Sequence, residues 1–165
     1  MLPVKFDTAR NWFETLRDEM VNSLEELDTF KFAITEWDHK EEGGGKMSKI
    51  NGSVIEKGGV NISSVAGKFE KDMVEKIPGT KNDPSYQATG ISVVLHLHSP
   101  HIPSMHFNTR YLKTGQEWFG GGMDITPCLS FGDEKNYHLS LKKMCNKFNK
   151  KYYQKYKKWC DEYFY

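Results

Sequence analysis

Residues 91–127 read ISVVLHLHSPHIPSMHFNTRYLKTGQEWFGGGMDITP, and they contain the two most clearly patterned strands that the sequence predicts. It holds four of the chain's six histidines, together with Arg110, three consecutive glycines and Asp124. Side chains of a β-strand alternate between its two faces. From 91 to 98 the odd positions are aliphatic, whereas the even positions include a serine and two histidines. The sequence therefore predicts a strand with one apolar face and one polar face.

A second strand is predicted over 105–111, because the same alternation recurs there. One face carries His106, Asn108 and Arg110, and the other carries Met105, Phe107, Thr109 and Tyr111. Two neighbouring strands of this kind form a polar wall on an apolar support. Such a wall is typical of a binding or catalytic site.

Composition restricts the class of protein. The 165 residues suffice for one domain with a core, and 38% are hydrophobic. The net charge of +1 gives no indication of nucleic-acid binding, and the lysines near the C-terminus read as a solvated helix face. No apolar run approaches the roughly 20 residues of a membrane span, and the N-terminus is unlike a signal peptide. Three cysteines without metal-type spacing favour a reduced, cytoplasmic compartment.

Apolar spacing predicts a helix that starts near Ala9 and is capped by Asp7 or Thr8. Its buried stripe is expected to comprise Trp12, Phe13, Leu16, Met20, Leu24 and Leu27. A strand is expected over 30–35. Three glycines at 43–45 lack the lysine-serine or lysine-threonine ending of a phosphate loop, so they indicate a close approach of the backbone.

Asn51-Gly52 predicts a hairpin with arms at 47–50 and 53–56, since both residue types tolerate positive φ. Gly58-Gly59 is expected to break that run before another strand at 60–65. Two helices should follow Pro127. Their expected buried stripes are Tyr137, Leu141, Met144, Cys145 and Phe148, after a cap at Asp133, and then Tyr152, Tyr156, Trp159, Cys160 and Tyr163. The order predicts an α+β fold with a mostly antiparallel sheet flanked by helices, in a single domain over 1–165.

His96, His106 and Asp124 supply two imidazoles and a carboxylate, the ligand set of a non-haem iron site, and His138 could add a fourth donor. The alternative is that these histidines are hydrogen-bonded wall residues. For His98 and His101, which lie in a proline-containing turn, the structural interpretation is favoured.

Arg110 could grip a carboxylate or phosphate through two hydrogen bonds, or it could form an internal salt bridge with Asp124 or Glu117. Glycines 120–122 inside a strand indicate either a bulge or the close approach of a flat ligand. No nucleophile elbow and no CxxC motif is present, so nucleophilic hydrolysis and thiol redox chemistry lack support.

Four segments together resemble the aerobic, oxygen-dependent coproporphyrinogen III oxidase family. They are GGGKMSKINGSVIEKGGVNIS at 43–63, SVVLHLHSPHIPSMHFNTRY at 92–111, WFGGGMDITP at 118–127 and KKWCDEYFY at 157–165. The resemblance implies oxidative decarboxylation of two propionates of coproporphyrinogen III to vinyls, which gives protoporphyrinogen IX in haem biosynthesis. It further implies molecular oxygen as co-substrate, no organic cofactor, a large antiparallel sheet flanked by helices, and a homodimer.

The resemblance also implies residue roles. His106 matches the family's proton donor, and Asp124 matches the aspartate that engages the pyrrole N–H groups. The substrate contacts match Ser92, Asn108, Thr109 and Arg110. Three positions proposed as metal ligands in some bacterial members match His96, His106 and His138, and whether the family needs a divalent metal is disputed.

Family members continue beyond the DEYFY segment at 161–165 to a further histidine and a glycine-rich segment. We therefore expect the chain to be the N-terminal part of a longer oxidase, and weak or inactive by itself. Two alternatives stay open at this point. One is a non-haem iron oxygenase, and the other is a tetrapyrrole-binding fragment without turnover.

Overall fold

The computed structural model describes residues 5–129 and 134–164. Four helices and six strands lie within these ranges, and the predicted α+β class is confirmed. In chain order they are α1 (Phe6–Glu25), β1 (Ala33–Asp38), β2 (Glu42–Ile50), β3 (Ile55–Lys68), α2 (Lys71–Val74), β4 (Ser85–Leu97), β5 (Ser104–Lys113), β6 (Glu117–Thr126), α3 (Glu134–Asn146) and α4 (Tyr152–Phe164). None of these helices is long and apolar enough to cross a membrane.

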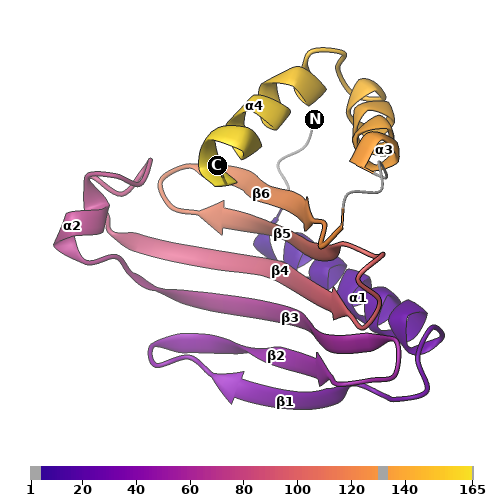
Figure 1. Ribbon diagram of the computed structural model, residues 1–165. Helices are drawn as coiled ribbons and strands as arrows, with labels where there is room; N and C mark the ends of the chain where they lie inside the picture. The colour runs from indigo at the N-terminus through magenta and orange to yellow at the C-terminus, as the bar shows by residue number, and fades with distance from the viewer. Residues whose placement is uncertain (1–4, 130–133, 165) are drawn as a thin grey trace.

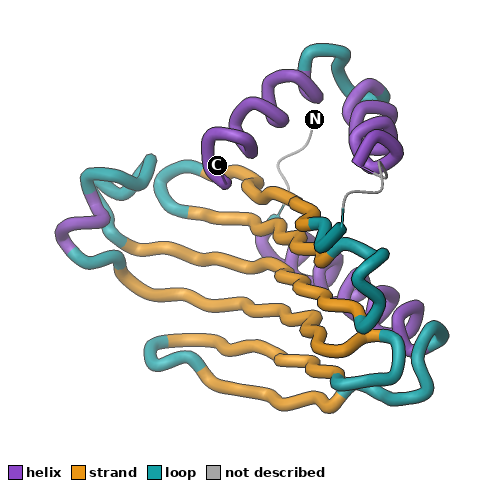
Figure 2. The backbone as a smooth tube through the Cα atoms, in the orientation of Figure 1, coloured by secondary structure: helices purple, strands orange, loops and turns teal. Residues whose placement is uncertain are grey.

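The six strands form one sheet in the order β1 to β6, and each strand pairs antiparallel with the next one along the chain (Figures 1 and 2). Four of the five connections are loops, whereas the connection from β3 to β4 carries the short helix α2, which extends past the ends of the strands (Figure 2). This meander places β4, β5 and β6 side by side. The predicted polar strands are therefore neighbours.

Helix α1 packs against one face of the sheet, over β3, β4 and β5, and lies behind the strands in Figure 1. Its buried positions recur every four residues, at Ala9, Phe13, Arg17 and Val21. The core between helix and sheet also contains Val60, Ile62, Ile91, Val93, Leu95 and Tyr111. The apolar face predicted for 91–98 is thus the face that α1 covers, so the polar face points the other way.

The helical stripe was predicted correctly only in part. Trp12 is 54% exposed and Leu27 is 65% exposed, and Leu27 lies beyond the end of α1. Residues 9, 13, 17 and 21 form the face of α1 that packs on the sheet. Trp12 lies outside this face, and its side chain is therefore largely exposed. The expected cap was wrong as well, since Lys5 is the N-cap residue and makes no side-chain capping bond. Asp7 lies in the first turn instead, where its charge complements the helix dipole.

One buried polar contact fastens α1 to the sheet. Arg17 is 6% exposed, and it donates to the hydroxyl of the fully buried Ser48 on β2, from Nε at 3.1 Å and from Nη2 at 2.6 Å. The same guanidinium pairs with Asp18. A buried charge is tolerated only when it is paired and hydrogen-bonded, and these contacts meet that requirement.

A turn follows β2 at residues 51 and 52 as expected, but the predicted hairpin arms are wrong, because Ile50 pairs with Gly58 and residues 53–56 do not pair with β2. The turn does not use positive φ at either residue. Asp28, which follows α1, holds the turn instead. Its carboxylate accepts hydrogen bonds from the backbone N–H groups of Ser53, Val54 and Ile55 at 2.9 Å each. Burial would raise the pKa of Asp28, but these donors and the Phe30 N–H outweigh it and hold the pKa well below its usual value.

Two strand boundaries differ from expectation. Gly58 and Gly59 do not interrupt the sheet, because each is paired on both sides, to β2 and to β4, within the continuous strand β3. The β3–β4 pairing is irregular only between Ile55 and Lys57, where its register shifts by one residue as in a β-bulge. The first strand occupies Ala33–Asp38 rather than 30–35, since it starts only where it meets the end of β2.

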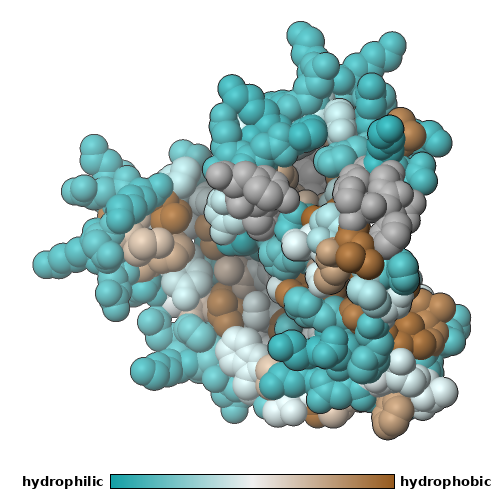
Figure 3. Space-filling view, viewed as in Figure 1, coloured by the Kyte–Doolittle hydropathy of each residue, from teal (hydrophilic) through white to brown (hydrophobic). Residues whose placement is uncertain are grey.

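Helices α3 and α4 follow β6 in the chain and contact each other, and α4 also contacts β6 (Figure 1). The expected cap at Asp133 lies outside the described residues. Their predicted stripes are partly wrong, because Phe148 is 80% exposed and Tyr163 is 83% exposed. Among the described elements α3 packs mainly against α4, and α4 also contacts β6, so only part of each predicted apolar stripe is covered. Figure 3 shows hydrophilic side chains over most of the surface where the two helices lie.

Candidate functional site

The face of the sheet that α1 does not cover carries the predicted polar residues, and their positions follow from strand register. On β4, β5 and β6, Ser92 lies opposite Asn108, which lies opposite Gly122. In the next row, Val94 lies opposite His106, which lies opposite Asp124. We call this group the polar face, defined by Ser92, His106, Asn108, Arg110, Gly122 and Asp124. Its front is turned to the viewer in Figure 1.

A chain of hydrogen bonds runs along β5 on the polar face. Asn108 bridges His106, at 3.5 Å between Nδ2 and Nε2, and Arg110, whose Nη2 donates to Oδ1 at 3.1 Å. Residues two apart on a strand share a face, so this row is a direct product of the sequence alternation. The side chains of this row carry several N–H groups, and these can donate hydrogen bonds to an anionic group.

Arg110 makes no ion pair with a carboxylate of the described residues. The expected alternative partner, Glu117, instead accepts a hydrogen bond from the Tyr111 hydroxyl at 2.8 Å and pairs with Lys113 at 3.6 Å. The exposed guanidinium is therefore available to a ligand. Its planar fork suits a carboxylate, which can accept two parallel hydrogen bonds.

Glycines 120–122 lie in β6 without a bulge, because the register between β5 and β6 is continuous. The bulge interpretation is thereby excluded. A Cβ on Gly121 would lie 2.3 Å from the carbonyl oxygen of Asn108, so this glycine permits close strand packing. A Cβ on Gly122 would meet nothing within 4 Å, so this position leaves open space on the polar face.

Sequence reasoning missed one member of this neighbourhood. Tyr137 on α3 was placed in an apolar stripe, but the structure brings it near Asp124. Burial raises the pKa of Tyr137 to about 12, and electrostatic interactions with Asp124 and Cys160 act in the same direction. The one sequence feature that could have indicated Tyr137 is its position directly before His138, and a single neighbouring residue is a weak indication.

The histidines do not converge on a metal centre. His96 Nδ1 lies 3.1 Å from the Ser104 hydroxyl, and His138 Nδ1 lies 3.1 Å from the Tyr153 hydroxyl. Across residues 5–129 and 134–164, no three histidine, cysteine or acidic side chains form a group that could hold a metal ion. The donor sets predicted from His96, His106, Asp124 and His138 therefore do not fit a metal as the structure places them.

The remaining predicted residues lie elsewhere. Thr109 pairs with Ile91 in the row that faces α1, so the structure does not bring its side chain to the polar face. His98 is exposed, and its Nε2 lies 3.1 Å from the Gly52 carbonyl oxygen, which ties the β2–β3 turn to the end of β4. His101 is also exposed, in the loop before β5.

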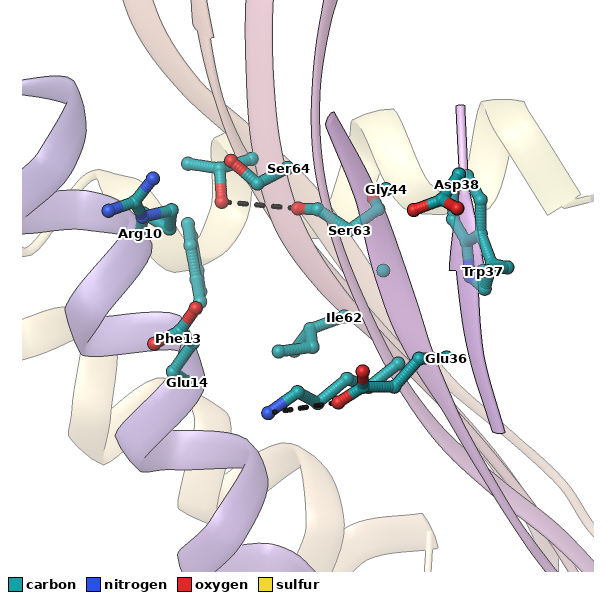
Figure 4. A pocket seen from close by; sticks show the side chains of 13 residues that line it. Arg10, Phe13, Glu14, Glu36, Trp37, Asp38, Gly44, Ile62, Ser63 and Ser64 are labelled. Atoms are coloured by element: carbon teal, nitrogen blue, oxygen red, sulfur yellow. Dashed lines mark hydrogen bonds and ion pairs between the residues drawn. The ribbon is translucent and has the colours of Figure 1, made fainter. Parts of the chain in front are cut away.

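A cavity of about 290 Å³ opens on the other side of the sheet, between α1 and strands β1 to β4 (Figure 4). Arg10 and Glu14 approach it from the helix, and Ile62 forms part of its floor. The Lys46–Glu36 ion pair, at 3.6 Å, crosses its rim. Because this cavity shares no residue with the polar face, it is separate from the candidate site.

The fold and the polar face define an α+β protein in which one face of the antiparallel sheet carries a row of polar side chains. Comparison with known proteins then gives the family. The sequence model of the family described as coproporphyrinogen III oxidase matches residues 8–165. This chain belongs to the coproporphyrinogen III oxidase family.

Curated relatives agree with this assignment. The oxygen-dependent coproporphyrinogen-III oxidase of Rickettsia akari (strain Hartford) is 46% identical over 170 residues, and the match covers 96% of this chain. The proteins of the same name from Rickettsia rickettsii (strain Sheila Smith) and Rickettsia bellii (strain OSU 85-389) are 46% and 45% identical, with the same coverage. The chain spans 61% of the length of each of these relatives.

Proposed function

We propose that this chain takes part in the oxygen-dependent oxidative decarboxylation of coproporphyrinogen III to protoporphyrinogen IX, and that the polar face binds the substrate. The names of the relatives support the reaction. The observation that carries the binding site is the in-register set of Ser92, Asn108, His106 and Asp124 on one face, with Arg110 beside them.

The proposed reaction balances with molecular oxygen as its one oxidant. Each propionic acid side chain, –CH2–CH2–COOH, loses carbon dioxide and two hydrogen atoms and becomes a vinyl group, –CH=CH2. One O2 molecule accepts the two electrons and two protons, and it leaves as hydrogen peroxide. Two such cycles convert two propionates, which gives two CO2 and two H2O2 for each protoporphyrinogen formed.

The contacts of the polar face support distinct tasks for its residues. Arg110, which Asn108 orients through a hydrogen bond, binds a propionate carboxylate and fixes the orientation of the substrate. A fixed orientation lowers the entropic part of the reaction barrier. Asp124 accepts pyrrole N–H bonds and holds electron density on the ring. His106 lies opposite Asp124 and within contact of Asn108, where it can donate a proton. Ser92 adds a hydroxyl in the row of Asn108.

No step is assigned to a metal, because the imidazoles do not converge. The proposal also holds that no organic cofactor takes part, that the chain is one domain and that the protein acts as a cytoplasmic homodimer. The free state of Cys128, Cys145 and Cys160 agrees with a reducing compartment.

Anaerobic titration with coproporphyrinogen III, followed by admission of oxygen, tests the proposal. We expect saturable binding, and then oxygen uptake, vinyl product and peroxide in the ratio given above. The Rickettsia akari enzyme serves as the positive control, and a parallel assay contains a chelator. Binding without oxygen uptake would favour a tetrapyrrole-binding role instead. Loss of turnover with the chelator, restored by ferrous iron, would favour the iron oxygenase alternative.

A further inference from the structure

The side of the sheet that carries the polar face extends past β4 onto β3 and β2, which lie next to it in Figure 1. Asn61 on β3 lies opposite Ser92, which lies opposite Asn108, so these three residues form one row across three strands. In the adjoining row, one residue of β4 separates Gly59 on β3 from His106. Directly opposed residues share a face of the sheet. The register therefore places Asn61 and Gly59 on the side of the candidate site.

The carboxamide of Asn61 is held in one orientation over Gly59. Its Oδ1 accepts a hydrogen bond from the backbone N–H of Ser48 at 3.2 Å, so the other end of the group is the Nδ2 donor. A Cβ on Gly59 would lie 3.3 Å from Nδ2, and a glycine at this position leaves room for the amide. Nδ2 makes no hydrogen bond to any described residue and is not among their buried unpaired atoms. Its two N–H groups are therefore accessible to a ligand.

Lys49 on β2 adds a positive charge beside this amide. It lies directly opposite Gly59, and such residues have Cα atoms about 4.5–5.5 Å apart. The Lys49 side chain is exposed, and it forms no ion pair with a carboxylate of the described residues. Together with Arg110 it gives this side of the sheet two cations that are available to an anionic ligand.

Lys49 and Asn61 lie apart from Arg110, to which the proposed function assigns one propionate. Asn61 and Arg110 are two strands and two residues apart, which separates their Cα atoms by about 12 Å. A ligand with one carboxylate would engage one of the two groups, whereas a flat ring with several carboxylates at its edge can engage both. Coproporphyrinogen III is a ligand of the second kind, since it carries four propionates.

We propose that Lys49 and Asn61 form a second carboxylate subsite, which binds a propionate of coproporphyrinogen III other than the one that Arg110 binds. This inference rests on the proposed function, because it takes that substrate as the ligand. The ammonium group supplies charge, and the amide supplies donors whose direction is fixed before the ligand binds. Two points of attachment prevent rotation of the ring about the Arg110 contact. The subsite thereby selects which propionate lies next to His106.

Asn61→Asp and Lys49→Gln test the subsite. Aspartate keeps the oxygen that accepts the Ser48 N–H, so the free energy of unfolding should not fall. It replaces the donor with a second negatively charged oxygen, so binding of coproporphyrinogen III should weaken by at least about 10-fold. Lys49→Gln should weaken binding by about 2- to 5-fold, because it removes one exposed charge. A purely structural role of Asn61 would leave the affinity of a stable Asn61→Asp variant unchanged.

Anaerobic titration with coproporphyrinogen III measures the affinities, and urea unfolding measures the stabilities. Lys46→Gln is the matched control, since Lys46 lies on the same strand but lines the cavity on the α1 side, and its affinity should equal that of the wild type. If Asn61→Asp does not fold, the exposed Lys49→Gln decides. Wild-type affinity of either subsite variant would overturn the inference and leave the proposed function intact. An equal loss in Lys46→Gln would overturn it as well, and absence of binding by the wild type would overturn both.

Discussion

His106 and Asp124 lie directly opposite each other on β5 and β6, as a cross-strand pair on the face of the sheet that α1 leaves uncovered. Side chains of directly opposed residues have Cβ atoms about 4.5–5.5 Å apart. Their mutual position is thus fixed by backbone register rather than by contacts of the side chains. An imidazole and a carboxylate at this separation can act on the same ligand.

Arg110→Lys should weaken binding of coproporphyrinogen III by about 10-fold, because lysine keeps the charge but loses the fork that holds a carboxylate at two points. Anaerobic titration measures the affinity. Arg10→Lys is the matched control, since Arg10 lies on α1 at the other side of the sheet. Unchanged affinity of Arg110→Lys would show that charge alone governs binding, and an equal loss in both variants would show that the effect is not specific to the polar face.

Gly121→Ala and Gly122→Ala should separate folding from binding. The first adds a methyl group against the Asn108 carbonyl and should cost about 1–3 kcal/mol of unfolding free energy. The second adds it in open space, so stability should change little while ligand affinity falls. Urea unfolding and ligand titration measure the two effects. Unchanged affinity of Gly122→Ala would argue against a ligand that lies close to β6.

Ser48→Ala should destabilise the protein by about 1–3 kcal/mol, because it leaves the Nε and Nη2 donors of the buried Arg17 guanidinium without their acceptor. Adding Arg17→Met should recover part of that loss, since the double variant buries no donor that lacks an acceptor. Urea unfolding of both single variants and of the double variant gives the coupling. Additive losses would show that the two residues act independently.

Asp28→Asn should lower the melting temperature at pH 7, because the amide nitrogen cannot accept the backbone hydrogen bonds of the β2–β3 turn. The pKa of Asp28 is depressed in the folded state, so its contribution is present above the unfolded pKa, about 3.9, and fades as pH falls below it. The difference between wild type and variant should therefore shrink below about pH 4. Melting by circular dichroism at pH 7 and pH 3 measures it.

Glu56→Gln is the control for this prediction, since Glu56 is exposed at the start of β3. Its melting temperature should follow that of the wild type at both pH values. A constant gap between Asp28→Asn and wild type down to pH 3 would mean that the turn is held by something other than the ionised carboxylate.

The sequence predicted the polar face well because strand alternation has a period of two. Once 91–98 and 105–111 were taken as strands, His106, Asn108 and Arg110 had to share a face, and the register confirms this. The antiparallel order followed from short connections. Both inferences depend only on neighbouring residues, which a sequence displays directly.

Contacts between distant segments were not predictable in the same way. Asp28 holds a turn more than twenty residues further on, and Tyr137 on α3 is within electrostatic influence of Asp124 on β6. The interruption expected at Gly58 and Gly59 was wrong for a related reason. Strands on both sides keep these glycines extended, and no local pattern reports the presence of those strands.

The order of the sheet also affects how the protein folds. Every strand pairs with its neighbour in sequence, so every pairing except that of β3 with β4, whose connection carries α2, closes a short loop. Short loops cost little entropy, and folding speeds up as contacting residues lie closer along the chain. The residues of the polar face on β4, β5 and β6 can thus come together by two successive hairpin closures. Their assembly needs no contact with the distant helix α1.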